Sequence, residues 1–249
     1  MKIAIFGNGL IGSQLAARLN AAGHETVALG RRDGIDTTTG AGLASAVAGA
    51  DVVVDLTNSP SWADDDVLAF FRESTRNLLA AEAEAGVGHH VALTIVGAER
   101  LQDAGYMRAK LAQEELIQAG GVPYTIVRST QFFEFIPGIA GASTVDGVVH
   151  ASPGALQPIA SADVVARLAE IVTGAPLDAM VEVAGPEVAG IDELARRFFA
   201  STGDTQSVVT DPEAGYFGAM LDSTALIATP GADAWIAPTT LDDWLRGRA

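Results

Sequence analysis

The sequence predicts an α/β protein with a parallel sheet covered by helices on both faces, and three observations support this prediction. Short β-branched runs alternate with longer, alanine-rich amphipathic stretches through the first half of the chain. The runs at 51–56 and 91–96 are apolar on both faces, as strands buried between two helical layers must be. A glycine-rich turn separates the first run from the first amphipathic stretch. The sequence therefore predicts a doubly wound sheet.

The alternation also places the individual elements of this sheet. Each β-branched run is expected to form a strand, and each amphipathic stretch a helix that returns the chain to the next parallel strand. The expected strands lie at about 2–6, 25–29, 51–56, 90–96 and 123–128. The expected helices lie at about 10–22, 41–48, 64–85 and 106–119.

The pattern changes after Pro137, where glycine, serine and proline become frequent as far as Pro158. Shorter and less regular elements are expected beyond this point. They are a β element at about 148–159, a helix at about 161–173, a strand at about 180–184 and a helix at about 191–200.

No long polar linker divides the chain, so we expect a single domain. Its cofactor-binding core spans about 1–136, and a smaller lobe built onto that core spans about 137–249. The tail at 240–245 predicts a short capped helix that docks through Trp244 and Leu245.

The composition argues against a nucleic-acid or membrane partner. Lys and Arg total 15 against 31 Asp and Glu, for a formal net charge of -16, and so acidic a surface repels polyanions and anionic membranes. The chain has no cysteine, which excludes disulfides, thiol catalysis and thiolate metal sites. It shows neither a signal-peptide pattern nor a run of about 20 apolar residues. We therefore expect a cytoplasmic protein.

A glycine-rich turn follows the first strand and opens the first helix. It reads Gly7-Asn8-Gly9-Leu10-Ile11-Gly12. Glycines at this spacing permit a tight turn, let the backbone approach a pyrophosphate and allow close packing of helix on strand, while the helix N-terminus adds partial positive charge. The order of strand, turn, helix and second strand predicts a Rossmann-type dinucleotide site in which these six residues bind the cofactor. The alternative is a tight turn in another α/β fold.

Four further residues at strand ends are candidates for the same cofactor. Arg31 and Arg32 follow the second strand, where NAD-specific proteins place an acid. A guanidinium fork suits the 2′-phosphate of NADP, so the sequence favours NADP(H), with NAD(H) left open. The alternatives are a solvated basic pair, or Asp33 as an NAD-type acid. Thr57 and Asn58 follow the third strand, where they either contact the cofactor's ribose and adenine or cap the next helix.

Tyr106 and Lys110 lie four residues apart at the start of a predicted helix, and therefore on one face. Such a pair suits carbonyl chemistry, because the phenol exchanges a proton with a substrate oxygen while the cation lowers the phenol's pKa and binds cofactor ribose. Thr94, twelve residues before Tyr106, is expected to hold the same oxygen. By spacing alone, the pair also fits an aromatic anchor beside a solvated charge.

The glycine turn, the Tyr106 and Lys110 pair and the segment 122–133 together resemble the short-chain dehydrogenase/reductase superfamily. More closely, they resemble its atypical NmrA-like, NAD(P)H-binding branch, over most of the chain. The resemblance implies a Rossmann-type doubly wound parallel sheet with a small C-terminal substrate lobe, NADP(H) as the usual ligand, and catalytic roles for Thr94, Tyr106 and Lys110. Two features depart from the pattern: the first turn is one residue shorter than Gly-x-x-Gly-x-x-Gly, and many relatives have serine in place of Thr94.

The resemblance also implies a substrate wall after the fifth strand. Ser129 is expected to contact the cofactor, and Gln131, Phe132 and Phe133, with Phe135, to contact the substrate. An aromatic wall favours a hydrophobic carbonyl or quinone-like substrate. The alternative is core packing beneath the C-terminal lobe.

Two charged clusters suggest no catalysis. His89 and His90 precede the fourth long strand, on the amino edge of the sheet, and no carboxylates at ligand spacing accompany them, so no metal is expected. The run 64–66, three aspartates, marks a helix N-terminus.

The sequence thus predicts an NADPH-dependent oxidoreductase that transfers hydride to a hydrophobic carbonyl or quinone-like acceptor. Tyr106 donates the proton, Lys110 tunes Tyr106 and anchors ribose, and Thr94 orients the acceptor. The alternative is a non-catalytic NADP(H)-binding redox sensor, since some members of the branch lack the tyrosine. An epimerase or dehydratase of nucleotide sugars fits the short lobe and the phenylalanines less well. Expected partners are a small-molecule substrate and, through the long helices, a second copy of the chain.

Overall fold

The computed structural model describes residues 1–216 and 219–248, which divide into two compact units. Unit 1 comprises Met1–Thr94, Gly105–Arg128 and Val164–Val181. Unit 2 comprises Ile95–Ala104, Ser129–Asp163 and Glu182–Ala249. Unit 1 includes most of the helix at 161–173 and the start of the strand at 179–184, so the two units alternate along the chain. The expected single domain, with a core that ends at about residue 136, stays a prediction.

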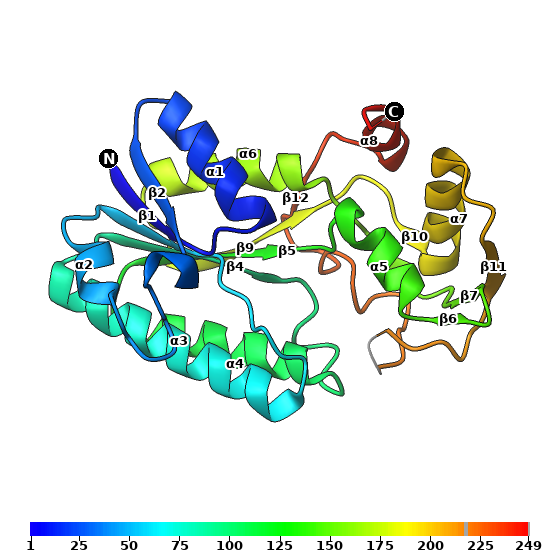
Figure 1. Ribbon diagram of the computed structural model, residues 1–249, viewed down its shortest axis with the longest axis horizontal. Helices are drawn as coiled ribbons and strands as arrows, with labels where there is room; N and C mark the ends of the chain where they lie inside the picture. Colours follow the sequence, from blue (N-terminus) through cyan, green and yellow to red (C-terminus); the bar gives the residue numbers. More distant parts are fainter. Residues whose placement is uncertain (217–218, 249) are drawn as a thin grey trace. The chain divides into compact units, whose positions relative to one another are not determined.

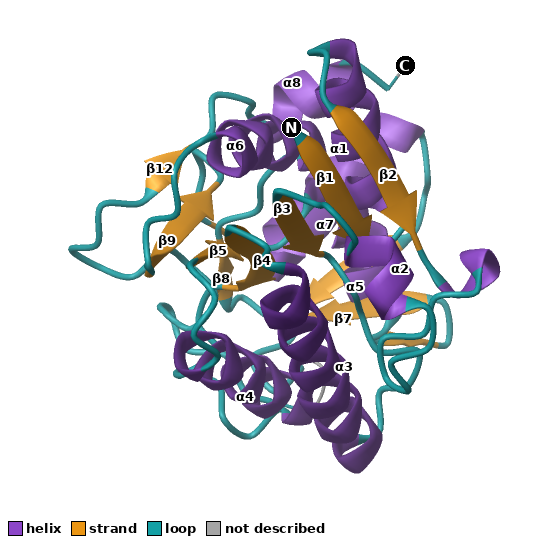
Figure 2. Ribbon diagram, turned by 90° about the vertical axis from the view of Figure 1, so that its left-hand side faces the viewer, coloured by secondary structure: helices purple, strands orange, loops and turns teal. Residues whose placement is uncertain are grey.

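A seven-stranded sheet runs in the order β12-β9-β5-β4-β3-β1-β2 (Figure 2). The pairs β1–β2, β1–β3, β3–β4 and β9–β12 are parallel. Because β2 and β3 lie on opposite sides of β1, the strand order reverses there, which confirms the predicted doubly wound topology. The strands are β1 (Lys2–Phe6), β2 (Glu25–Leu29), β3 (Val52–Asp55), β4 (His89–Ile95), β5 (Tyr124–Ser129), β9 (Ala179–Ala184) and β12 (Trp235–Ile236).

Helices cover both faces of the strands in unit 1. Figure 1 shows α1 and α6 on one face and α3 and α4 on the other. All four residues of β3 are buried, as a strand between two helical layers requires. In the described part of the chain, no helix is both long and apolar enough to cross a membrane. The helices are α1 (Leu10–Ala21), α2 (Leu43–Val47), α3 (Asp64–Ala85), α4 (Gly105–Ala119) and α6 (Ser161–Thr173).

Apolar side chains fix α3 and α4 against the sheet. Fully burying one large aliphatic side chain contributes about 1.5–3 kcal/mol, so these contacts hold the strand ends in place. One cluster joins β4 and β5 to both helices and contains Leu79, Ala92, Ile117, Val122 and Ile126. Another joins β1 and β3 to α2 and α3 and contains Ala4, Phe6, Ile35, Leu43, Val47, Ala50, Val53, Leu78 and Val87.

Unit 2 is built from short elements. Its sheet has the order β11-β7-β6, and β8 pairs with β10. The predicted tail helix is confirmed: Thr240 accepts a hydrogen bond from the backbone N–H of Asp243, and the Trp244 ring centroid lies 5.4 Å from that of Phe133. The elements are α5 (Ile136–Gly141), β6 (Thr144–Val145), β7 (Val148–Ala151), β8 (Ala155–Leu156), β10 (Ala189–Gly190), α7 (Ile191–Thr202), β11 (Ser207–Thr210) and α8 (Leu241–Arg246).

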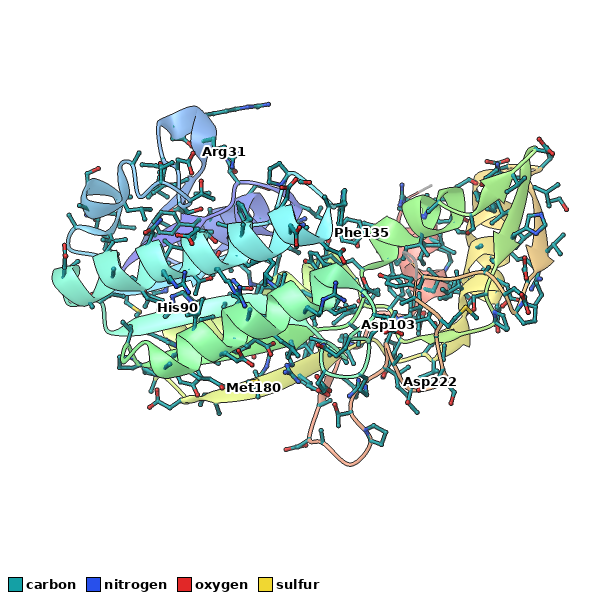
Figure 3. The ribbon with its side chains drawn as sticks, turned by 90° about the horizontal axis from the view of Figure 1, so that it is seen from below. Arg31, His90, Asp103, Phe135, Met180 and Asp222 are labelled. Atoms are coloured by element: carbon teal, nitrogen blue, oxygen red, sulfur yellow. The ribbon has the colours of Figure 1, made fainter. Side chains whose placement is uncertain are left out.

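A buried ion pair lies at the amino end of β4. Nδ1 of His90 (Figure 3) is 2.9 Å and 3.0 Å from the two carboxylate oxygens of Glu82, and both residues are fully buried. Burial opposes a charged imidazole, but the adjacent carboxylate outweighs it and the pKa of His90 is raised. Desolvation instead lowers the pKa of His89 to about 4. Within residues 1–216 and 219–248 no three acidic, histidine or cysteine side chains are arranged to hold a metal ion.

The Glu82→Gln substitution tests this pair through pH. Because the folded pKa of His90 is raised above its ordinary value of 6.5, the stabilisation is complete below that value and is lost as pH rises through the folded pKa. We expect Glu82→Gln to lower the free energy of unfolding by about 3 kcal/mol near pH 6, with a smaller loss at higher pH. Urea unfolding across this range measures it. Glu84→Gln, exposed on the same helix, is the control, and a loss independent of pH contradicts the ion pair.

Candidate functional site

The glycine turn between β1 and α1 is tightly constrained at two positions and open at a third. Gly7 has a φ of +112°, and a Cβ there would lie 2.5 Å from the carbonyl oxygen of Leu56. A Cβ at Gly12 would lie 1.8 Å from the carbonyl oxygen of Gly7. A Cβ at Gly9 would meet no atom within 4 Å. The fold therefore requires Gly7 and Gly12, whereas Gly9 leaves room for a ligand group close to the backbone.

The N-terminus of α1 is suited to an anion. Its N-cap, Gly9, has no side chain to satisfy the first amides, and the first turn carries no acidic residue. Those amides and the helix dipole attract phosphate. Ile11 is buried in the core, while Asn8 and Leu10 are exposed beside the turn. The turn therefore fits the pyrophosphate of a dinucleotide.

A pocket of about 180 Å³ opens beyond the carboxyl ends of β1, β2 and β3. It lies beside the reversal of strand order, where ligands bind in open α/β sheets. Four of the predicted cofactor residues line it, namely Gly7, Arg31, Thr57 and Asn58. The remaining lining residues are Phe6, Leu29, Gly30, Ile35, Thr37, Pro60 and Phe70.

Both arginines lie in a 3-10 helix over Arg31–Asp33 that follows β2. Both arginines are exposed, and of the two only Arg31 (Figure 3) is among the residues that line the pocket. The carboxylate of Asp33 accepts a hydrogen bond of 2.9 Å from the backbone N–H of Gly30. The carboxylate of Asp33 is thus engaged by the local backbone, and the charged side chain that lines the pocket is the guanidinium of Arg31.

Tyr106, near the start of α4, packs against two aromatic rings from other parts of the chain. Its ring centroid is 5.6 Å from that of Trp62 and 5.9 Å from that of Phe71. Burial raises the pKa of Tyr106 to about 12, because desolvation disfavours the phenolate. The expected lowering by Lys110 is therefore not found. A phenol with this pKa is protonated at neutral pH, the form that a proton donor needs.

Lys110 is buried, with only 2% of its surface exposed, so the alternative of a solvated charge is wrong. Its ammonium donates 3.2 Å to the carbonyl oxygen of Leu93 and also donates to Oε1 of Gln113. It lies 4.3 Å from the ring centroid of Phe71, within the range of a cation–π contact. Burial lowers the pKa of Lys110 to about 8, against the opposing effect of nearby carboxylates.

The hydroxyl of Thr94 is hydrogen-bonded to a buried ion pair formed by Glu114 and Arg128. It donates a hydrogen bond of 2.6 Å to Glu114. Arg128 donates to the same carboxylate from Nε at 2.9 Å and from Nη2 at 2.6 Å. Because its hydrogen is taken, Thr94 has lone pairs left to offer. Sequence reasoning missed Glu114 and Arg128; the available signal was an arginine within an apolar strand.

Ser129, predicted to contact the cofactor, and the residues predicted for the substrate wall lie in unit 2. Ser129 is buried and donates 2.9 Å to the carbonyl oxygen of Thr130. Phe133 is buried against Trp244, so for this residue the core-packing alternative holds. The ring of Phe132 stacks on that of Phe135, with centroids 5.4 Å apart, and Gln131 is buried. Contact of these side chains with a substrate stays a prediction.

Comparison with known proteins finds one matching family. The family model described as NAD(P)H-binding matches residues 7–173. No curated protein sequence matches the chain.

Solved structures of similar fold cover nearly the whole chain. MoeE5 in complex with UDP-glucose and NAD has a TM-score of 0.77 and 19% identity, covering 99% of this chain and 96% of that one. A short-chain dehydrogenase/reductase superfamily protein from Agrobacterium tumefaciens with bound NAD has a TM-score of 0.74 and 19% identity, covering 99% and 95%. A dTDP-4-dehydrorhamnose reductase from Bacillus anthracis with NADP has a TM-score of 0.70 and 15% identity, covering 100% and 92%. The resemblance to this superfamily is thus confirmed at the level of an NAD(P)-binding fold.

The different constraints on Gly9 and Gly12 give a paired test of the turn. We expect Gly9→Val to cost about 1 kcal/mol of stability or less and to weaken NADPH binding by about 100-fold or more, because the side chain occupies the space beside the backbone. Gly12→Ala is expected to destabilise the fold itself, since its Cβ meets the Gly7 carbonyl. Thermal unfolding and calorimetric titration with NADPH separate the two effects. Unchanged binding in folded Gly9→Val would contradict the assignment.

Proposed function

Because the chain belongs to the NAD(P)H-binding family, we propose that it is an NADPH-dependent oxidoreductase acting on a hydrophobic carbonyl or quinone-like acceptor. The observation that carries the proposal is the burial of Lys110 on the same helix as Tyr106, in the unit that contains the nucleotide pocket. Burying an ammonium is costly, and a lysine placed only for solubility would stay in water. A functional role for the pair accounts for this cost.

The proposed cofactor contacts follow from the geometry of unit 1. The backbone at Gly9 and the first amides of α1 hold the pyrophosphate, and Thr57 and Asn58 hold the adenosine half. Arg31 pairs with the 2′-phosphate, which favours NADPH over NADH. When bound, the reduced nicotinamide supplies a hydride.

The chain's own part in the reaction is proton transfer and positioning. As the acceptor carbon takes the hydride, the phenol of Tyr106 gives its proton to the acceptor oxygen, and solvent restores that proton afterwards. Lys110 packs on the same Phe71 ring as Tyr106 and is proposed to stabilise the tyrosinate that forms during turnover, although it does not lower the pKa of Tyr106 in the structure. Thr94 offers lone pairs to a hydroxyl, since its hydrogen is held by Glu114. The product is an alcohol or, from a quinone, a hydroquinone.

The side chain of Trp62, which packs beside Tyr106, favours the proposal of a planar, apolar acceptor. Trp62 is 66% exposed although its ring packs on Tyr106. An exposed indole next to a proton donor offers a stacking surface for a quinone. The predicted cofactor contact of Ser129, the predicted substrate wall of Gln131, Phe132 and Phe133, and the predicted homodimer are part of the same proposal.

Arg31 and Arg32 provide a matched test of nucleotide preference. We expect Arg31→Ala to weaken NADPH binding about 10-fold to 100-fold, because hydrogen bonds to charged groups contribute about 1.5–3 kcal/mol. NADH binding should stay within about 2-fold. Arg32→Ala removes the same charge one residue away and should have the smaller effect. Calorimetric titration with both nucleotides measures this, and equal weakening of NADPH and NADH would contradict a 2′-phosphate contact.

Tyr106→Phe tests the chemistry. With menadione as acceptor, we expect this variant to lower kcat for NADPH oxidation by about 100-fold or more while NADPH still binds. Tyr124→Phe, on β5, is the control. Unchanged turnover in Tyr106→Phe would overturn the mechanism. A wild-type protein that binds NADPH without oxidising it would favour the redox sensor, and a thermal shift with UDP-glucose would favour a nucleotide-sugar enzyme.

A further inference from the structure

We propose that Gln113 is a positioning residue that fixes the ammonium of Lys110, an inference that rests on the proposed function in giving Lys110 a role beside Tyr106. Gln113 follows Lys110 by one helical turn on α4 and is fully buried. Its Oε1 accepts a hydrogen bond from Nζ of Lys110, and its Nε2 donates 2.9 Å to Oδ2 of Asp55. A primary amide is the group that accepts from an ammonium and donates to a carboxylate at the same time.

The hydrogen-bonded chain continues from Gln113 to the nucleotide pocket. Oδ1 of Asp55 accepts from the backbone N–H of Thr57 at 2.9 Å and from its hydroxyl at 2.7 Å. Asp55 is 1% exposed, and Thr57 lines the pocket. Three side chains therefore join the pocket wall to Lys110, all within unit 1.

Charged groups around Lys110 explain why the amide matters. Asp55 faces it from β3 and Glu114 from α4, and both raise the pKa of Lys110 against the larger effect of desolvation. The carboxylate of Glu114 is held by Arg128 and Thr94. The negative charge of Asp55 is linked to the ammonium through Gln113.

The other elements packed on Lys110 offer weaker or shared contacts. From α3 it meets the ring of Phe71, and from β4 the carbonyl oxygen of Leu93. Tyr106, the titratable group one turn earlier on α4, packs on the same ring. Gln113 is therefore the side chain whose removal takes both an acceptor and a link to negative charge from Lys110.

Two substitutions at this position have opposite expected effects. Gln113→Met keeps the length of the side chain but removes both hydrogen bonds, so the charged ammonium loses stabilisation and the pKa of Lys110 falls below about 8. Gln113→Glu places a carboxylate against the ammonium, so the pKa of Lys110 rises by about one pH unit or more. If Gln113 only filled space, the two substitutions would not shift the pKa of Lys110 in opposite directions.

Nuclear magnetic resonance can follow Lys110 directly, because the chain contains two lysines, Lys2 and Lys110. Protein labelled in lysine alone gives two side-chain signals, which Lys2→Arg assigns. Titration of wild type, Gln113→Met and Gln113→Glu should give a pKa of Lys110 in the order Met, Gln, Glu. Gln118→Met, exposed on the same helix, should match wild type. If the pKa of Lys110 agrees within about 0.3 pH unit in all folded variants, the inference is wrong.

Turnover supplies a second readout that a purely structural role would not move. The alkaline limb of NADPH oxidation with menadione should move to higher pH in Gln113→Glu, in step with the pKa of Lys110. An unmoved limb alongside a lower thermal midpoint would overturn the positioning role. Gln113→Glu retains hydrogen bonding to Lys110 and keeps the test open if Gln113→Met does not fold. If wild type oxidises no NADPH, the proposed function fails while the order of pKa values still decides the role of Gln113.

Discussion

The burial of an ammonium beneath the sheet is the constraint on which the rest of the site depends. Lys110 is one of two lysines in the chain, yet it is 2% exposed, and such a charge is tolerated where every donor finds a partner. Leu93, Gln113 and the ring of Phe71 provide those partners. Leu93 belongs to β4, Gln113 to α4 and Phe71 to α3, so each partner comes from a different element. The packing of both helices against the sheet is thus tied to one charged group.

A buried ion pair between Glu114 and Arg128 lies near Lys110 and engages the third candidate residue, Thr94. Glu114 is shared by Arg128 and Thr94, so the hydroxyl hydrogen of Thr94 is already engaged in a hydrogen bond. The phenol of Tyr106 is desolvated and held protonated. The proposed mechanism draws on these three groups: a protonated phenol, a buried cation and a hydroxyl that accepts. This combination suits donation of a proton to an oxygen that is becoming an alcohol.

Much of the fold could be predicted because a β-branched run bounded by glycine marks a strand and a long apolar period marks a helix. The strands at 2–6 and 25–29 and the helix at 64–85 agree with β1, β2 and α3 residue for residue. The elements α5, β11 and β12, two to six residues long, have too few residues for a period to show. The glycine turn was predictable from spacing, but the different constraints on Gly7, Gly9 and Gly12 depend on backbone atoms of Leu56 and of Gly7 that the spacing does not reveal.

By itself, the sequence determined the sheet, the dinucleotide turn and the candidates Tyr106 and Lys110, because each depends on residues close together along the chain. Tertiary structure alone decided that Lys110 is buried and that Tyr106 has a raised pKa. It also decided that Asp55 and Gln113, 58 positions apart, meet. These properties depend on which side chains from distant strands and helices exclude water from one another. Local pattern carries no information about that exclusion, since desolvation is set by every neighbour at once.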